Sequence, residues 1–144
     1  MIRKMISSDI EAIISLEMEA FNKTLGKDFL MNELNNPIAY YLVLELNGFV
    51  MGYIGSYFSF GLIDIINFVV DKSIRNNGYG SILIEELIKD GQKKGMESVI
   101  LDVKENNFIA ISFYKKIGFK QIGIRKKYYD GDIDAINFEK KLVK

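Results

Sequence analysis

The stretch VDKSIRNNGYGSIL, residues 70–83, decides the fold, because it joins an apolar strand pattern to a helical pattern through two glycines, Gly78 and Gly80. A glycine in a helix interior costs about 1 kcal/mol relative to alanine. Two glycines at the start of a helix therefore indicate that a ligand approaches the main chain closely there. The free N–H groups at the start of a helix bind anions, and phosphate groups in particular.

The composition limits the chemistry that this chain can perform. The 144 residues contain neither cysteine nor histidine, which excludes disulfides, a Ser-His-Asp triad, a Cys-His pair and the usual zinc sites. Lysine plus arginine equals aspartate plus glutamate at 19 each, so the overall charge attracts neither nucleic acid nor an anionic membrane. We therefore expect an anion site that is local to one loop, no metal, and catalysis by carboxylates, tyrosine, lysine or main-chain groups.

Chain length and hydrophobic content predict a single domain over residues 1–144. With 49% hydrophobic residues, a chain of this length can bury a core without disulfides or metal ions. Glycine and serine interrupt the uncharged run at residues 47–63, which is too short for a convincing membrane span. No signal-peptide pattern follows the first residues, and the absence of cysteine suits a reducing compartment, so we expect a cytoplasmic protein.

Hydrophobic periodicity and turn signals predict the order β-α-α-β-β-β-α-β-α-β-β, which indicates an α/β domain with a mixed sheet. Ser8 and Glu11 form a capping-box pattern at the start of the first helix, and Asn47-Gly48 and Asp130-Gly131 are hairpin signals. The predicted strands span residues 2–6, 40–46, 49–58, 62–70, 98–103, 119–128 and 132–142. The predicted helices span residues 8–21, 27–35, 79–94 and 107–117.

Three phosphate-binding patterns compete for residues 75–80. A P-loop requires a Gly-Lys-Ser/Thr ending, and a dinucleotide fingerprint requires a third glycine or alanine near Leu83; neither is present. The remaining pattern, Arg75-Asn-Asn-Gly78-Tyr-Gly80, resembles the pyrophosphate loop Gln/Arg-x-x-Gly-x-Gly/Ala of the GNAT N-acetyltransferases. This resemblance implies the GNAT fold, a mixed and mostly antiparallel seven-stranded sheet flanked by helices, with acetyl-CoA as the co-substrate.

The resemblance continues toward the carboxy terminus. Residues 106–119, NNFIAISFYKKIGF, are similar to the Asn-x-x-Ala-x-x-x-Tyr-x-x-x-Gly-Phe segment of the family. Residues 124–129 and 134–136 resemble the carboxy-terminal hairpin of the RimI-type enzymes, the ribosomal-protein-alanine N-acetyltransferases. Residues 20–24 differ from the Phe-Pro-Trp-Ser/Thr-like stretch of those enzymes, which helps to shape the acceptor site in the family. This difference affects the predicted identity of the acceptor more than the predicted reaction.

Main-chain groups make up most of the predicted cofactor site. The resemblance implies that the main chain of Phe68, Val69 and Val70 pairs with the pantetheine arm, and that N–H groups of this strand stabilise the oxyanion. Asn107 is expected to bond the pantetheine. Arg75 is expected to contact a phosphate, with a solvated loop cation as an equal alternative. The residues whose amides are expected to hold the diphosphate are Asn76, Asn77, Gly78, Tyr79, Gly80 and Ser81.

Three side chains are candidates for proton transfer. Asp102 matches the glutamate base of the family, Asp64 matches the other carboxylate position that the wider family uses, and Tyr114 is the candidate general acid toward sulfur. A solvated strand-edge aspartate is the alternative for Asp102, and the rim of a core stripe is the alternative for Tyr114. A peptide α-amine, with a pKa of about 8, needs a weaker base than lysine, which costs about 4 kcal/mol more to deprotonate.

The predicted function is acetyl transfer from acetyl-CoA to a primary amine, with the N-terminal α-amine of a protein, such as the alanine of a ribosomal protein, as the expected acceptor. One alternative is a GNAT enzyme that acetylates a small amine such as a polyamine. A non-catalytic acyl-CoA-binding regulatory module also remains open, whereas a nucleotide-binding α/β domain lacks its phosphate-binding lysine. A monomer and a homodimer both agree with the sequence.

Overall fold

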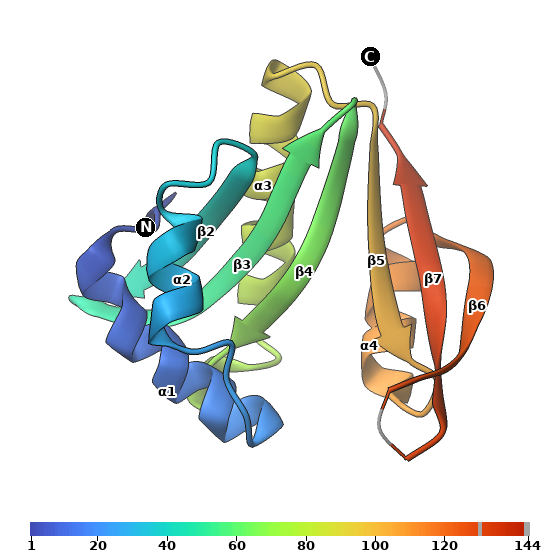
Figure 1. Ribbon diagram of the computed structural model, residues 1–144, viewed down its shortest axis with the longest axis horizontal. Helices are drawn as coiled ribbons and strands as arrows, with labels where there is room; N and C mark the ends of the chain where they lie inside the picture. Colours follow the sequence, from blue (N-terminus) through green and yellow to red (C-terminus); the bar gives the residue numbers. More distant parts are fainter. Residues whose placement is uncertain (130, 143–144) are drawn as a thin grey trace.

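The computed structural model describes residues 1–129 and 131–142 and shows one seven-stranded sheet between two layers of helices (Figure 1). Its strands are β1 (Ile2–Lys4), β2 (Ala39–Leu46), β3 (Phe49–Ser59), β4 (Leu62–Val70), β5 (Ser98–Lys104), β6 (Lys120–Tyr129) and β7 (Ile133–Lys141). Its helices are α1 (Ile10–Phe21), α2 (Lys27–Glu33), α3 (Tyr79–Lys93) and α4 (Phe108–Lys116), with 3-10 turns η1 (Ser7–Asp9) and η2 (Lys72–Ile74). This order confirms the predicted sequence of strands and helices.

The strand order across the sheet is β1-β2-β3-β4-β5-β7-β6. All neighbouring strands are antiparallel except β4 and β5, which confirms the predicted mixed and mostly antiparallel sheet. The parallel pair is short, because residues 62–64 of β4 pair with residues 98–100 of β5 and no later residues do. Beyond this point the two strands diverge toward their carboxyl ends (Figure 1).

Two hairpin turns were predicted. Asn47 and Gly48 form the first, with φ angles of 52° and 83°, and Leu46 pairs with Phe49 across it. These positive φ angles suit a two-residue hairpin between twisted strands. Asp130 of the second turn lies outside the described residues, while β6 and β7 on either side of it pair antiparallel.

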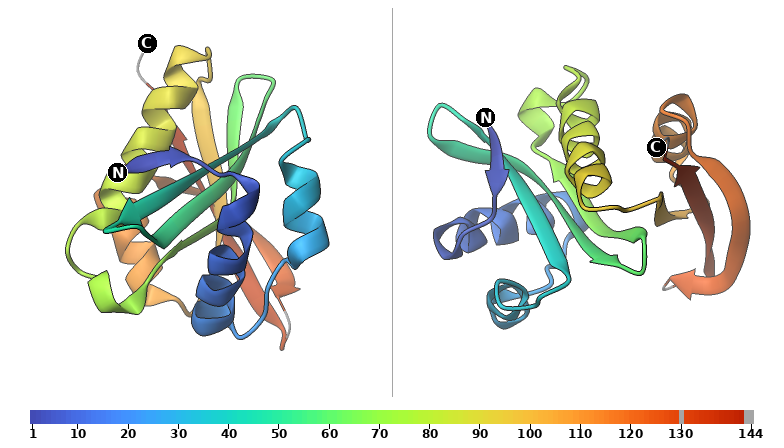
Figure 2. Two further views of the ribbon diagram at one scale, coloured as in Figure 1. Left: turned by 90° about the vertical axis from the view of Figure 1, so that its left-hand side faces the viewer. Right: turned by 90° about the horizontal axis from the view of Figure 1, so that it is seen from above.

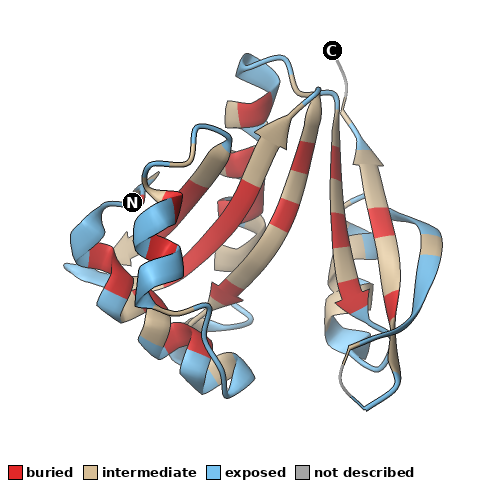
Figure 3. Cartoon of the chain, viewed as in Figure 1, coloured by how far each residue is buried: buried red, intermediate tan, exposed pale blue. Residues whose placement is uncertain are grey.

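Each face of the sheet has its own hydrophobic core. On one face, Leu83, Ile84 and Leu87 of α3 are fully buried against the sheet, at the spacing of a helical apolar face. On the other face, Ile10 and Ile13 of α1 are buried with residues of α2 and the central strands. Figure 2 shows α1 and α2 on the face opposite α3 and α4, and Figure 3 shows the buried residues along the central strands. No helix in the described part of the chain is long and apolar enough to cross a membrane.

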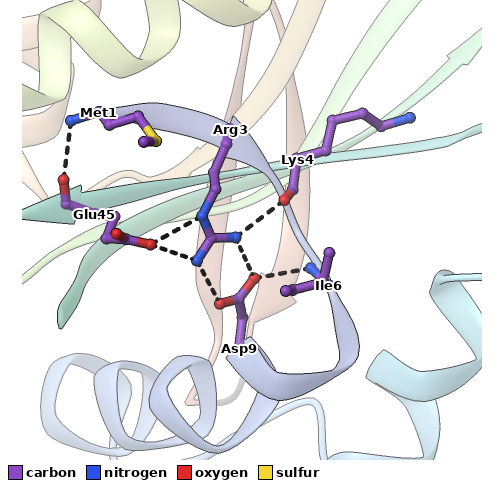
Figure 4. A network of polar contacts seen from close by, with 6 residues as sticks. All are labelled: Met1, Arg3, Lys4, Ile6, Asp9 and Glu45. Carbon is purple, nitrogen blue, oxygen red and sulfur yellow. Dashed lines mark hydrogen bonds and ion pairs between the residues drawn. The ribbon is translucent and has the colours of Figure 1, made fainter. Parts of the chain in front are cut away.

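The start of α1 differs from the predicted capping box. Among the described residues, the Ser8 side chain makes no hydrogen bond, and the Asp9 carboxylate takes the place of a cap by accepting from the Ile6 amide at 2.8 Å. Both Asp9 oxygens also accept from the Arg3 guanidinium, at 2.8 and 2.9 Å, and Arg3 bonds Glu45 as well (Figure 4). Ser8 does not act as the cap because it lies within the 3-10 turn η1, whose preceding residue is Ile6. The Asp9 carboxylate is held at the Ile6 amide by its charge-assisted hydrogen bonds with Arg3.

Candidate active site

A cleft of about 750 Å³ lies where β4 and β5 diverge, and a smaller cavity of about 270 Å³ adjoins it. Asn107, Tyr114 and Asp102 line the larger cleft, although they come from the start of α4, its middle and β5. Asp102 and Tyr129 line both spaces, and Asp64 lines the smaller cavity. The fold therefore brings the three predicted catalytic side chains to one continuous depression.

The main chain of β4 faces this cleft only at alternate residues. The Asp71 amide donates to the Met51 carbonyl of β3 at 2.7 Å. Because successive residues of a strand point their polar groups to opposite edges, Val69 also faces β3, while Phe68 and Val70 face the open edge. Of the three residues predicted to hold the pantetheine through their main chain, Phe68 and Val70 face the open edge, whereas the main chain of Val69 faces β3.

Two main-chain groups on the open edge of β4 already have partners. The Phe68 amide donates to Oδ1 of Asn67 at 3.1 Å, and the Val70 carbonyl accepts from Nε of Arg75 at 3.0 Å. The Phe68 carbonyl and the Val70 amide have no partner among the described residues. One acceptor and one donor are therefore available to an extended ligand with amide groups.

The amides at the start of α3, which were predicted to bind an anion, have no partners within the described residues. The first helical hydrogen bond runs from Ile82 to Gly78 at 3.2 Å, and no amide of residues 76–81 donates to another described residue. Gly78 has a φ of 84°, and no atom lies within 4 Å of the position that a Cβ would occupy there. A Cβ on Gly80 would meet two aromatic rings at ordinary contact distances of 3.7 and 3.8 Å. Packing within the chain therefore leaves this backbone open, as a bound diphosphate requires.

The side chains of the loop contact the protein itself. Nδ2 of Asn77 donates to the carbonyls of Ile74 and Arg75, both at 3.1 Å. Nη2 of Arg75 lies 3.6 Å from Oε2 of Glu19 on α1, in addition to the bond from its Nε to β4. Tyr79 packs partly against the core, and Asn76 and Ser81 make no side-chain hydrogen bond within the described residues. The amides, rather than the Arg75 charge, are thus the groups of this loop that remain open.

Asp102 and Asp64 lie on the same face of the sheet. Asp64 pairs with Ile100, two residues before Asp102, so both carboxylates project from that face. The side-chain amide of Asn137 donates to Oδ1 of Asp102, and Nη1 of Arg125 lies 3.9 Å from Oδ2. Burial raises the pKa of Asp64, as does the charge of Asp102, while Arg125 opposes the increase. No group of carboxylates in the described residues is arranged to hold a metal ion.

Tyr114 presents a free hydroxyl from a fixed ring. The ring contacts Phe119 and Phe138 at centroid distances of 5.5 and 6.4 Å, and the hydroxyl has no hydrogen-bond partner among the described residues. Burial raises the pKa of Tyr114, so the hydroxyl keeps its proton at neutral pH. Asn107 lines the same cleft, but its Oδ1 caps α4 by accepting from the Ala110 amide at 3.1 Å, which leaves only its Nδ2 for a ligand.

No sequence motif pointed to Glu17, which also lines the cleft and is completely buried. Its carboxylate accepts hydrogen bonds from the Tyr53 and Thr24 hydroxyls, from Nδ2 of Asn67 at 2.7 Å and from the Leu25 amide at 3.1 Å. It thereby ties the connection between α1 and α2 to β3 and β4. The available signal was a charged residue on the buried face of an apolar helix, where carboxylates are rare unless they are paired.

Known proteins resemble this chain in sequence and in fold. The model of the acetyltransferase (GNAT) family matches residues 9–119. The chain is 32% identical over 137 residues to a putative [ribosomal protein bS18]-alanine N-acetyltransferase of Bacillus subtilis, covering 94% of this chain and 91% of that protein. It is 37% identical over 75 residues to the [ribosomal protein bS18]-alanine N-acetyltransferase of Escherichia coli K12, half of either chain (50% and 51%). The crystal structure of the Escherichia coli ribosomal-protein-S18-alanine N-acetyltransferase superposes with a TM-score of 0.91 at 24% identity, covering 100% of this chain and 94% of that one.

Proposed function

The chain belongs to the acetyltransferase (GNAT) family and is an acetyl-CoA-dependent N-acetyltransferase, and we propose that its acceptor is the N-terminal α-amine of a protein. The observation that carries this proposal is the placement of Asp102 and Tyr114 in one cleft, beside the open edge of β4. The name of the Bacillus subtilis relative, which covers nearly the whole chain, supports the same class of acceptor.

The residues of the cleft fit acetyl-CoA, which supplies an acetyl group on a thioester when it is bound. We assign the diphosphate to the amides of residues 76–81 and the pantetheine amides to the Phe68 carbonyl and the Val70 amide. Nδ2 of Asn107 is a further donor on the opposite wall of the cleft. Arg75 supports the site indirectly, since it holds the loop to the end of β4.

We assign Asp102 to deprotonation of the amine and Tyr114 to the departing sulfur. Asp102, held by Asn137, accepts a proton from the ammonium group of the acceptor, which has a pKa of about 8 and needs only a weak base. Asp64 is the second candidate for this role, since its raised pKa suits a proton acceptor. Tyr114 donates a hydrogen bond to the sulfur as negative charge develops there.

The charges of the cleft include both signs. Lys23 and Lys104 line the larger cleft, Arg125 lines the smaller cavity, and the carboxylates of Glu17, Asp64 and Asp102 match these three cations in number. The cleft therefore has no excess of negative charge for the several ammonium groups of a polyamine. A peptide, which presents one ammonium group followed by neutral amides, suits such a cleft better.

The test is a comparison of acceptors with the purified chain and acetyl-CoA. An alanine-leading peptide, the same peptide blocked at its amino terminus but carrying an internal lysine, and spermidine are each assayed for release of free CoA and by mass spectrometry. We expect acetylation of the free α-amine alone, and turnover reduced at least about tenfold in Tyr114→Phe. Preference for spermidine, or acetyl-CoA binding without turnover of any amine, would overturn the proposal in favour of a small-amine enzyme or a binding module.

A further inference from the structure

Strand β6 contains a bulge beside the cleft. Arg125 pairs with Ala135 and Tyr129 pairs with Ile133, so residues 126–128 of β6 stand opposite the single residue Asp134 of β7. The extra residues cannot follow the regular ladder, and the strand must bend there. Within the bulge, Lys127 has a φ of 52°. This left-handed conformation costs a residue with a side chain about 1–2 kcal/mol, so other contacts must stabilise it.

Asp134 supplies those contacts. Its Oδ1 accepts from the Lys127 amide at 2.9 Å, and its Oδ2 lies 3.2 Å from Nζ of Lys126. The bond from the Lys127 amide, and then Lys126, lower the pKa of Asp134, so the carboxylate is charged at neutral pH. Since Lys126 is 79% exposed, its ion pair contributes little, and the bond to the Lys127 amide is the main contact. The main chain of Asp134 is held as well, because its carbonyl accepts from the Glu105 amide at 3.0 Å.

The bulge determines which side chains of β6 line the smaller cavity, in which Asp64 and Asp102 lie. Successive residues of a regular strand point to opposite faces, so Tyr128 and Tyr129 should not share one. Both nevertheless line the smaller cavity together with Arg125. The ring of Tyr128 contacts that of Tyr129 at a centroid distance of 5.1 Å, and Arg125 lies 5.2 Å from the Tyr128 ring. These three residues therefore form one wall, which depends on the bend of β6.

We propose that Asp134 is a positioning residue for the acceptor: by holding Lys127 in its left-handed conformation, it places Arg125, Tyr128 and Tyr129 along the path of the incoming amine. This inference rests on the proposed function, because the wall that Asp134 holds borders the smaller cavity, which contains Asp64 and Asp102, the two candidate bases for the acceptor amine. Asp134 does not line either cavity, so it acts through the bulge and not by contact with substrate.

Four variants separate this role from general stabilisation. Asp134→Ala removes the acceptor for the Lys127 amide, whereas Asp134→Asn keeps a carbonyl oxygen for it and Lys126→Ala removes only the ion pair. In the double variant Asp134→Ala with Lys127→Gly, glycine adopts the positive φ without help. Steady-state kinetics with acetyl-CoA and an alanine-leading peptide give KM for each substrate and kcat for every variant.

We expect Asp134→Ala to raise the KM of the peptide about tenfold and to leave the KM of acetyl-CoA within about twofold. Asp134→Asn and Lys126→Ala should stay within about threefold of the unmodified chain, and the double variant should recover most of the loss. An unchanged peptide KM in Asp134→Ala overturns the proposal. So does a parallel rise of both KM values, or a double variant that recovers nothing.

A measurement without an acceptor keeps this inference separate from the proposed function. Backbone amide NMR spectra of the same variants should show shifts for residues 125–129 in Asp134→Ala that return toward the original positions in the double variant. An unmodified chain that acetylates no peptide refutes the proposed function and with it the role toward a peptide acceptor. Unchanged NMR signals for residues 125–129 in Asp134→Ala refute the structural role of Asp134, whatever the acceptor is.

Discussion

Asp102 of β5 and Asn137 of β7 lie directly opposite each other in the sheet, and the Asn137 side-chain amide donates a hydrogen bond to the Asp102 carboxylate. This bond occupies one oxygen, while the other lies 3.9 Å from Arg125. Asp102 is thus held in a defined orientation on the cleft face of the sheet. Asp64, two positions away on the same face, has neither a hydrogen bond nor an ion pair within the described residues.

Replacing Asp102 should therefore impair catalysis more than replacing Asp64. We expect Asp102→Asn to lower kcat/KM for an alanine-leading peptide about 10²- to 10⁴-fold, because it removes a positioned proton acceptor. Asp64→Asn should lower it by about tenfold at most, since no hydrogen bond or ion pair within the described residues orients the Asp64 carboxylate. Acetyl-CoA affinity, measured by calorimetry, is the control and should not change. A larger loss in Asp64→Asn would transfer the role of base to Asp64.

Variants of Asn137 test the role of Asp102 through the pH dependence of kcat/KM. In Asn137→Asp a second carboxylate stands against Asp102, and like charges raise the pKa of a carboxyl group. The acidic limb of the pH profile of kcat/KM should therefore move to higher pH by about one unit or more. The replacement Asn137→Ala, which removes the hydrogen bond without adding a charge, is the matched control and should shift the limb less. Identical profiles for both variants would exclude Asp102 as the titrating base.

Gly78, which precedes α3, and Gly91 within it have different roles. No atom lies within 4 Å of a Cβ on Gly78, so Gly78→Val should place its bulk where the diphosphate binds and weaken acetyl-CoA binding by about tenfold or more, in addition to a backbone strain of about 1–2 kcal/mol from the positive φ. A Cβ on Gly91, by contrast, would lie 2.3 Å from Cδ1 of the buried Ile63. Gly91→Ala should lower the free energy of unfolding by about 1–3 kcal/mol while acetyl-CoA affinity stays unchanged. Calorimetry and urea unfolding of both variants check this, and equal losses of affinity would contradict it.

The network around Asp9 predicts a dependence of stability on pH (Figure 4). Burial alone would raise the pKa of Asp9, but the hydrogen bonds from Arg3 and the Ile6 amide outweigh it and lower the pKa. A pKa that is lower in the folded state contributes stability above the unfolded value of about 3.9, and this contribution is lost as the pH falls below it. At neutral pH, Asp9→Asn should therefore lower the free energy of unfolding by about 1–3 kcal/mol.

Urea unfolding between neutral and acidic pH measures this contribution. The unmodified chain should lose stability more steeply below about pH 4 than Asp9→Asn does, because the variant has no carboxylate to protonate there. Glu11→Gln is the control, since Glu11 is 78% exposed and its nearest cation, Lys27, lies 3.8 Å away. Parallel curves for Asp9→Asn and the unmodified chain would show that the Asp9 pair contributes no pH-dependent stability.

Local sequence signals were sufficient for the order of the elements. Asn47-Gly48 marks its turn because few other residue pairs adopt two positive φ angles, and Asn107, where the fourth helix was predicted to begin, caps α4 with its own side chain. The apolar period of Leu83, Ile84 and Leu87 placed α3 correctly. Turns, caps and apolar periods are formed by residues that are close in the sequence, so they can be predicted from the sequence alone.

Contacts between distant segments were not predictable in this way. The orientation of the Val69 main chain depends on its register with β3, and Arg75 is bonded to the end of β4 and paired with Glu19 of α1. Lys127 adopts a positive φ, which the sequence does not indicate because the residue is neither glycine nor asparagine. A hydrogen bond to Asp134 of the neighbouring strand stabilises this conformation. The sequence therefore predicted the open loop before α3 more fully than the walls of the cleft, which come from separate elements.

A crystal structure of the chain with coenzyme A covalently joined to an alanine-leading peptide tests the proposed site as a whole. We predict that the diphosphate binds the amides of residues 76–81, that the sulfur lies between Asp102 and Tyr114, and that the peptide leaves along Arg125 and Tyr129. A conjugate bound with its diphosphate away from the start of α3, or with its peptide outside the space between β4 and β5, would contradict the account.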